Sequence, residues 1–199
     1  MGTGRLVVGI TGASGAIYAQ RFLLNAARHF QEIYLTLSDQ AIQVAQTELG
    51  VAPSIDGNLE LWLGKQVPNI RLLNERDFFT PPASGSFRHD GMVIVPCSMG
   101  TAGRIANGIS NDLVTRAADV CLKEGRKLIV VPREMPWNVI MLRNLTTLAE
   151  AGATVLPACP AWYTRPQSLE ELADTVVARI LQQLGVDHGL QAEWMADKP

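Results

Sequence analysis

The chain has 199 residues, with 17 Lys and Arg against 19 Asp and Glu, which gives a formal net charge of −2. A hydrophobic fraction of 47% with 18% charged residues is typical of a globular domain and excludes a disordered chain. This charge balance provides no overall field for nucleic acid or an anionic membrane, and no apolar run approaches the ~20 residues that span a bilayer, so neither partner is predicted.

Strands and helices alternate along the first half of the chain. A buried strand is predicted over residues 5–10, then a glycine-rich loop over 11–15 and a helix with apolar residues at helical spacing. Residues 32–37 are predicted to form a second strand and 39–49 a helix, whereas 59–63 is ambiguous. A short strand is predicted at 70–73.

The second half repeats the alternation. Strands are predicted at 92–95 and 127–131, each ended by a proline, Pro96 and Pro132. Helices are predicted up to residue 109, over 112–123 and over 137–151, and the last strand over 154–156. Ser168 and Glu171 have the spacing of a capping box at the start of the final helix.

Continuous apolar strands separated by amphipathic helices predict an α/β fold with a parallel sheet covered on both faces. We expect a single-domain, Rossmann-like or flavodoxin-like three-layer sandwich over residues 1–184, with 185–199 as a C-terminal tail able to dock on a neighbouring subunit. No signal peptide is evident at the N-terminus. Three widely spaced cysteines without a Cys-x-x-Cys pair, and three scattered histidines, indicate a reducing, cytoplasmic location and no metal site.

Ligands of open parallel sheets bind beyond the carboxyl ends of the strands, which directs attention to the loops that follow them. The loop Gly9-Ile-Thr-Gly-Ala-Ser-Gly15 brings backbone amides to the start of a helix, where an anion is favoured. It is neither a Walker loop nor a strict Gly-x-Gly-x-x-Gly. After the second strand, Ser38 suits a helix cap or a phosphate contact, and Asp39 suits a ribose.

Two later loops carry further polar groups. Ser98 and Thr101 lie at the start of a helix and suit a phosphate, and Cys97 beside them is expected to be a buried structural thiol. Arg133 and Glu134 follow a central strand and are flanked by two prolines, which favours a functional position over a surface ion pair.

Several motifs in order resemble one family, the flavin prenyltransferases of the UbiX type. The resemblance spans residues 6 to about 184. The motifs are the glycine-rich start, Pro96-Cys-Ser-Met-Gly-Thr101, Thr115-Arg-Ala-Ala-Asp-Val120 with Leu122-Lys-Glu124, Val131-Pro-Arg-Glu-Met-Pro136, and Pro160-Ala-Trp-Tyr163 with Arg165-Pro-Gln-Ser168. Residues 51–69 match none of them.

The resemblance implies an enzyme that binds FMN and transfers a dimethylallyl group from dimethylallyl phosphate to N5 and C6 of reduced FMN. The product, prenylated FMN, would serve a UbiD-type decarboxylase, and no metal would be needed. Members of the family often form dodecamers with sites at subunit contacts, so a homo-oligomer is expected.

The same resemblance implies roles for particular residues. Flavin contacts are implied for Gly12, Ala13, Ser14, Ser38, Ser98, Met99, Gly100, Thr101 and Arg133. Prenyl phosphate contacts are implied for Arg116, Lys123, Arg133, Glu134, Tyr163 and Arg179, because arginine matches phosphate oxygens in a fork. Catalytic roles are implied for Ser14, Glu48 and Glu134. Aromatic candidates for stabilising an allyl cation are Phe78, Trp137 and Trp194.

Three other functions stay open at this point. The first is an FMN-dependent cysteine-type decarboxylase of the same fold, which would need a catalytic histidine before the central strand; His89 is nearby but lacks the expected neighbours. The second is a noncatalytic flavin carrier, which would not need the arginines. The third is an NAD-dependent oxidoreductase that uses Gly15 and Asp39, against which the glycine spacing argues.

Overall fold

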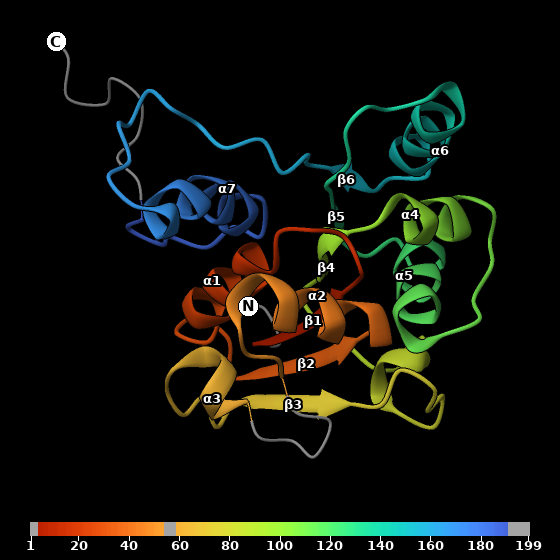
Figure 1. Ribbon diagram of the computed structural model, residues 1–199. Coiled ribbons are helices and arrows are strands. Elements are labelled where there is room, and N and C mark those ends of the chain that lie inside the picture. The colour runs from red at the N-terminus through yellow and green to blue at the C-terminus, as the bar shows by residue number, and fades with distance from the viewer. Residues whose placement is uncertain (1–3, 54–58, 191–199) are drawn as a thin grey trace, which may run out of the picture.

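Six parallel strands form the centre of the protein, in the order β3-β2-β1-β4-β5-β6 (Figure 1). The computed structural model describes residues 4–53 and 59–190. The strands are β1 (Arg5–Ile10), β2 (Glu32–Leu37), β3 (Ile70–Leu73), β4 (Met92–Cys97), β5 (Leu128–Pro132) and β6 (Thr154–Val155).

Helices cover both faces of this sheet and complete a three-layer sandwich. They are α1 (Ala16–Ala26), α2 (Asp39–Leu49), α3 (Glu60–Leu63), α4 (Met99–Ala106), α5 (Leu113–Lys123), α6 (Val139–Glu150) and α7 (Leu169–Gln183), with a 3-10 turn η1 at Pro81–Ala83. Side chains of α1, α3 and α7 fill the core on one face, and those of α4, α5 and α6 fill it on the other. The predicted α/β class is confirmed.

Strand side chains alternate between these two cores, which explains the unbroken apolar runs in the sequence. On β1, Leu6 and Val8 enter the core beside α1 and α7, whereas Val7 enters the core beside α5. On β5, Ile129 and Val130 divide in the same way. Because each face is buried, both sets of positions must be apolar.

Pro96 does not end its strand, contrary to the prediction. β4 continues through Pro96 to Cys97, and the peptide bond between Val95 and Pro96 is cis. The register against β5 shifts between Ile94 and Cys97. A proline lacks the N–H that a regular ladder uses, but at this irregularity that donor is not required, so the strand tolerates it.

The capping box that was predicted for α7 is only half formed. Ser168 Oγ accepts a hydrogen bond from the Glu171 amide at 3.1 Å, as expected, but the Glu171 carboxylate accepts from the Gln167 amide at 2.7 Å. Past α7, Val186 and Leu190 pack against the core beside α1. Trp194 lies outside the described residues.

Candidate functional site

The strand order reverses between β1 and β4. The chain adds β2 and β3 on the outer side of β1, and then β5 and β6 on the outer side of β4. Thr11 links the two loops at this point. Its Oγ1 donates to the Pro96 carbonyl at 3.0 Å and accepts from the Ser98 amide at 2.7 Å. Thr11 is buried, so these bonds hold the carboxyl ends of β1 and β4 in one fixed arrangement.

A pocket of about 330 Å³ opens beside this link, at the switch point where ligands of such sheets bind. Two helices start at it, each capped by a serine. Ser38 Oγ accepts from the Ala41 amide at 3.1 Å, and Ser98 Oγ accepts from the Thr101 amide at 3.2 Å. The lining residues are Gly12, Ser38, Gln40, Ser98, Gly100, Thr101 and Arg104.

Two helix N-termini directed at one pocket suit a phosphate, because the first-turn amides of a helix have no acceptor of their own. Five residues for which the sequence predicted flavin contacts, namely Gly12, Ser38, Ser98, Gly100 and Thr101, lie here. Ala13 and Met99 are buried, and Met99 packs into the core beside α5. Whether these seven contact a flavin stays a prediction, but the five in the pocket fit a phosphate group.

Gly12 has a steric reason to be glycine. A Cβ at this position would lie 2.5 Å from Gln40 Cβ, at the first turn of α2. We therefore expect Gly12→Ala to push α2 away from the pocket, lowering the free energy of unfolding by about 1–3 kcal/mol and weakening flavin binding. Thermal unfolding and flavin titration measure both effects.

Gly100 offers the matched control, because a Cβ there meets nothing within 4 Å in the described chain. Gly100→Ala should leave the melting temperature nearly unchanged. A second change, Gln40→Gly, removes the clashing Cβ and should restore binding to the Gly12→Ala variant. An unchanged Gly12→Ala protein would show that the loop adjusts freely and that Gly12 is not required by packing.

A carboxylate from α2 binds the end of the same loop. The Glu48 carboxylate, from the last turn of α2, accepts from the Gly15 amide at 2.9 and 3.1 Å and from the Ala16 amide at 2.8 Å. Glu48 also accepts a hydrogen bond from the Ser14 side chain. It thus caps α1 from a neighbouring helix.

Arg133 reaches the same loop from β5. Its Nε donates to the Ser14 carbonyl at 3.0 Å, and its own amide donates to the Cys97 carbonyl at 3.2 Å. Ser14, Glu48 and Arg133 are therefore brought together from three elements far apart in the sequence. Two of them, Ser14 and Glu48, carry predicted catalytic roles.

The pKa of Glu48 lies below its usual range. Desolvation acts to raise it, but the hydrogen bonds from Ser14 and from the Ala16 and Gly15 amides, with the positive charge of Arg133, outweigh this effect. The carboxylate therefore stays ionised at neutral pH and can accept a proton but not donate one.

Glu134 and Tyr163 lie near the carboxyl edge of the sheet but are exposed to solvent. Glu134 directly follows Arg133, and its carboxylate accepts from the amide of its neighbour Met135 at 3.0 Å. Tyr163 lies in the segment between β6 and α7 and is 57% exposed. Both side chains are therefore accessible at the surface.

The three remaining predicted phosphate cations do not line this pocket. Arg116 donates to the Ala83 carbonyl at 3.1 Å and pairs with Asp119 at 3.2 Å. Lys123 ends α5 five residues before β5 begins, so it lies at the opposite, amino edge of the sheet, paired with Glu124. Arg179 is exposed on α7, where it contacts Gln182.

The positions of Cys97, His89 and Asp39 do not favour a thiol nucleophile, a catalytic histidine or a ribose contact. Cys97 is fully buried, and burial raises its pKa to about 12, as expected of a structural thiol. His89 is buried before β4, bonded to the Gly91 carbonyl at 2.9 Å and near Cys121. Asp39 pairs with Arg76 at the surface at 3.2 Å.

The described residues contain neither a cluster of metal ligands nor a membrane-spanning helix. Across residues 4–53 and 59–190, no three His, Cys, Asp or Glu side chains are grouped as a metal ion requires. In the same residues, no helix has the length and apolarity needed to cross a bilayer.

Three residues at the site were missed by sequence reasoning: Thr11, Gln40 and Arg104. Thr11 stands where a strict dinucleotide-binding loop has glycine. This departure was a signal in the sequence that the threonine hydroxyl makes hydrogen bonds at this position. Gln40 and Arg104 follow the capping serines by two and six residues, within the first two turns of their helices. Arg104 carried no signal except its charge.

Comparison with known proteins identifies the family to which the chain belongs. The family model described as Flavoprotein matches residues 1–181. A flavin prenyltransferase UbiX from Thermoplasma acidophilum is 48% identical over 96% of this chain and 99% of its own. A crystal structure of AnUbiX (PadA1) in complex with FMN and dimethylallyl pyrophosphate is 38% identical, with a TM-score of 0.86 over 96% of both chains.

A second solved structure adds information on assembly. It is a dodecameric FMN-dependent Ubix-like decarboxylase from Escherichia coli O157:H7, 37% identical with a TM-score of 0.83, over 96% of this chain and all of that one. With near-complete coverage and this level of identity, the chain belongs to the flavin prenyltransferase (UbiX) family of flavoproteins.

Proposed function

We propose that this prenyltransferase joins the dimethylallyl group of dimethylallyl phosphate to N5 and C6 of reduced FMN and releases inorganic phosphate. The observation that carries the proposal is the meeting of Ser14, Glu48 and Arg133 next to a pocket formed by two helix N-termini. A flavin carrier needs the pocket and the cap that Glu48 gives α1, but it does not need the arginine held over the same loop.

The pocket would hold the phosphate of FMN, and the ring would extend toward Ser14 and Arg133. Reduced FMN, when bound, supplies the two nucleophilic positions that accept the five-carbon group. Arg133 would orient it with the guanidinium N–H groups not bonded to the Ser14 carbonyl, and Ser14, whose O–H is donated to Glu48, would offer its oxygen as an acceptor. Two protons leave the flavin, one from N5 and one from C6; Glu48 would take one up, directly or through Ser14, and return it to the alkene carbon, and the other would leave with the inorganic phosphate.

Of the cations predicted to hold the prenyl phosphate, Arg133 lies at the glycine-rich loop, whereas Arg116, Lys123 and Arg179 do not line the pocket. We therefore propose that the protein assembles as a homo-oligomer, a dodecamer like the Escherichia coli structure, in which Arg116, Lys123 or Arg179 of a neighbouring subunit completes the site. An arginine fork can stabilise a leaving phosphate where other enzymes use a metal ion. Accordingly, the reaction is proposed to be metal-independent.

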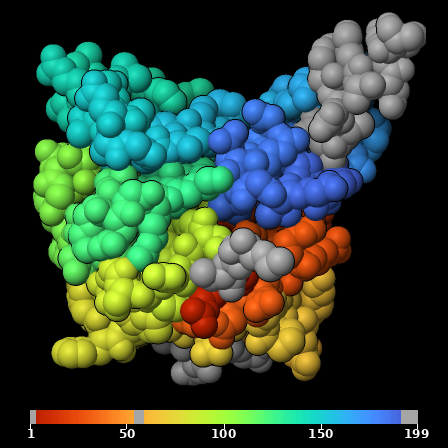
Figure 2. Space-filling model, turned by 180° about the vertical axis from the view of Figure 1, so that it is seen from behind, coloured from red at the N-terminus to blue at the C-terminus, as the bar shows by residue number. Residues whose placement is uncertain are grey.

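An apolar surface supports the assembly. It lies on α6 and the segment before it, which project from the body in Figure 1, on the segment after β6, next to α6 in Figure 2, and at the first residue of α7. Exposed apolar side chains in this number are typical of a subunit contact. Its exposed residues are Met135, Trp137, Val139, Ile140, Leu142, Trp162, Tyr163 and Leu169. The tail from residue 185 could dock on the same neighbour.

The proposal is tested by anaerobic incubation of the purified protein with reduced FMN and dimethylallyl phosphate, followed by mass spectrometry of the released flavin. We expect a flavin heavier by one five-carbon prenyl unit, formed over many turnovers and unaffected by EDTA. Unmodified FMN with both the monophosphate and the diphosphate donor would overturn the proposal, and inhibition by EDTA would overturn its metal-independent form.

We further propose that the prenylated FMN serves a UbiD-type decarboxylase in the cytoplasm. All three cysteines are free thiols, and the reaction uses a reduced flavin, so both features suit a reducing compartment. Adding the reaction product to an apo-decarboxylase of that type and measuring decarboxylation tests the handover.

A further inference from the structure

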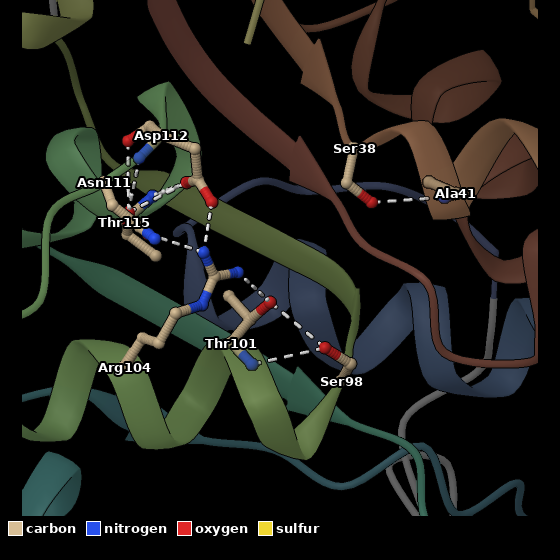
Figure 3. A network of polar contacts seen from close by, with 8 residues as sticks. All are labelled: Ser38, Ala41, Ser98, Thr101, Arg104, Asn111, Asp112 and Thr115. Atoms are coloured by element: carbon tan, nitrogen blue, oxygen red, sulfur yellow. Dashed lines mark hydrogen bonds and ion pairs between the residues drawn. The ribbon is translucent and has the colours of Figure 1, made fainter. Parts of the chain in front are cut away.

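Arg104 is the one cationic side chain among the described residues that line the pocket. It lies on the second turn of α4 and is held at both ends of its guanidinium (Figure 3). Nη2 donates to Thr101 Oγ1 at 3.1 Å, and Nη1 donates to Asn111 Oδ1 at 2.7 Å and pairs with Asp112. Figure 3 also shows Ser38, at the start of α2, apart from this network.

The partners of Arg104 are themselves fixed. Asp112 is the N-cap of α5 and accepts from the Thr115 amide at 2.8 Å, so its carboxylate cannot turn away without uncapping that helix. Thr101 Oγ1 also accepts from Ser98 Oγ at 3.0 Å. Arg104 is therefore joined to the serine that caps α4 on one side and to the cap of α5 on the other.

The network leaves two N–H groups of the Arg104 guanidinium without an acceptor in the described part of the chain. A guanidinium has five N–H groups, and three are used by Thr101, Asn111 and Asp112. In the described part of the chain, Nε and the second Nη2 hydrogen have no acceptor. Both lone pairs of Thr101 Oγ1 are occupied, so its own proton remains to be donated. These donors belong to residues that line one pocket.

We infer that Arg104 binds the phosphate of FMN and makes the site select FMN over riboflavin. Asp112 and Asn111 position it by holding the guanidinium before the ligand arrives, which reduces the entropy lost on binding. Arginine presents a planar fork to phosphate oxygens, and charge-assisted bonds of this kind are stronger than a neutral bond such as one from the Ser38 hydroxyl. The inference rests on the proposed placement of the FMN phosphate in this pocket.

The competing interpretation is a purely structural one, in which Arg104 only ties α4 to α5. The two interpretations differ in what removal of the charge does to two flavins that share one ring system. A structural tie would affect FMN and riboflavin alike, whereas a phosphate contact affects FMN alone.

The test compares oxidised FMN and riboflavin by fluorescence titration in the full-length protein, without a prenyl donor. Arg104→Met keeps the aliphatic stem and removes the fork, Arg104→Lys keeps the charge only, and Arg28→Ala, an exposed site after α1, is the matched control. We expect Arg104→Met to weaken FMN binding about 10- to 100-fold and leave riboflavin binding unchanged, with the lysine variant intermediate. Circular dichroism checks that each variant is folded.

Other outcomes are distinguishable. Equal weakening of both flavins, or an unchanged preference for FMN in a folded Arg104→Met variant, would overturn the inference and leave the proposed function intact. In a separate turnover assay of the same variant, a raised KM for dimethylallyl phosphate with unaltered flavin preference would assign Arg104 to the prenyl phosphate and also overturn the inference. A wild-type protein that binds riboflavin as tightly as FMN would refute the phosphate placement itself.

Discussion

Replacing Glu48 by glutamine is expected to lower the rate of prenylation by about 10²- to 10⁴-fold, the range lost when a general base is removed. The glutamine side chain has nearly the same size, but it presents an NH₂ group where the Gly15 and Ala16 amides and Ser14 need an acceptor. It also cannot take a proton. Single-turnover measurement of prenylated flavin, with saturating FMN, gives the rate of the chemical step.

A structural effect must be separated from this loss. Glu48 caps α1, and losing a cap costs about 1 kcal/mol, which lowers the melting temperature by about 2–4 °C in a chain of this size. A folded variant that binds FMN but turns over slowly supports the catalytic role. Glu170→Gln, on the exposed first turn of α7, is the control for the loss of one carboxylate. A Glu48→Gln rate within a factor of about three of wild type would remove Glu48 from the proposed mechanism.

The lowered pKa of Glu48 also predicts a pH dependence of stability. A carboxyl group with a lower pKa in the folded state than in the unfolded state stabilises the fold above its unfolded pKa, and this contribution is lost as the pH falls through its folded pKa. We therefore expect Glu48→Gln to show a shallower loss of stability than wild type below the usual carboxyl range. The same slope in both proteins would mean that Glu48 does not titrate differently on folding.

Local patterns in the sequence predict most of the sheet, because strands buried on both faces are marked by unbroken apolar runs. β1, β2 and β3 have the predicted bounds. β4 was predicted too short because a proline normally ends a strand, and only the shift in register against β5 shows why Pro96 is tolerated. The prediction of a capping box at α7 was wrong for the contact of the Glu171 side chain, because that carboxylate accepts from the amide of Gln167 instead of that of Ser168.

The site residues also divide into those that the sequence could predict and those that it could not. Ser38 and Ser98 could be placed at the pocket, because a serine between a strand and a helix caps the helix at the carboxyl edge. The contact of Glu48 with Gly15 could not, because it depends on the angle at which α2 crosses the start of α1. Arg104 likewise depends on where α5 begins, and Asp112 is eight residues further along the chain. Contacts between elements are set by packing and leave no periodic signal.

A second substitution with a large expected effect on the rate of prenylation lies in the loop after β5. We expect Arg133→Ala to abolish detectable prenylation while the oligomer stays assembled. Arg133 is the one residue given both a flavin and a prenyl phosphate role, and its Nε bond to the Ser14 carbonyl holds the guanidinium over the glycine-rich loop. A charged donor aimed at a departing phosphate contributes about 10²- to 10³-fold to the rate, and this residue would also orient the flavin.

The fold should stay stable after the change, because Arg133 is only partly buried. Its backbone amide donates a hydrogen bond to the Cys97 carbonyl, and alanine retains this bond. Arg133→Lys should recover only a small part of the rate, since an ammonium group cannot donate to the Ser14 carbonyl and to a phosphate in the same plane. Glu134→Ala is expected to be equally inactive. Arg28→Ala serves as the control for charge, and size-exclusion chromatography reports the assembly. Normal turnover by a folded Arg133→Ala oligomer would mean that the phosphate leaves toward cations of the neighbouring subunit alone, and the loop after β5 would lose its proposed role.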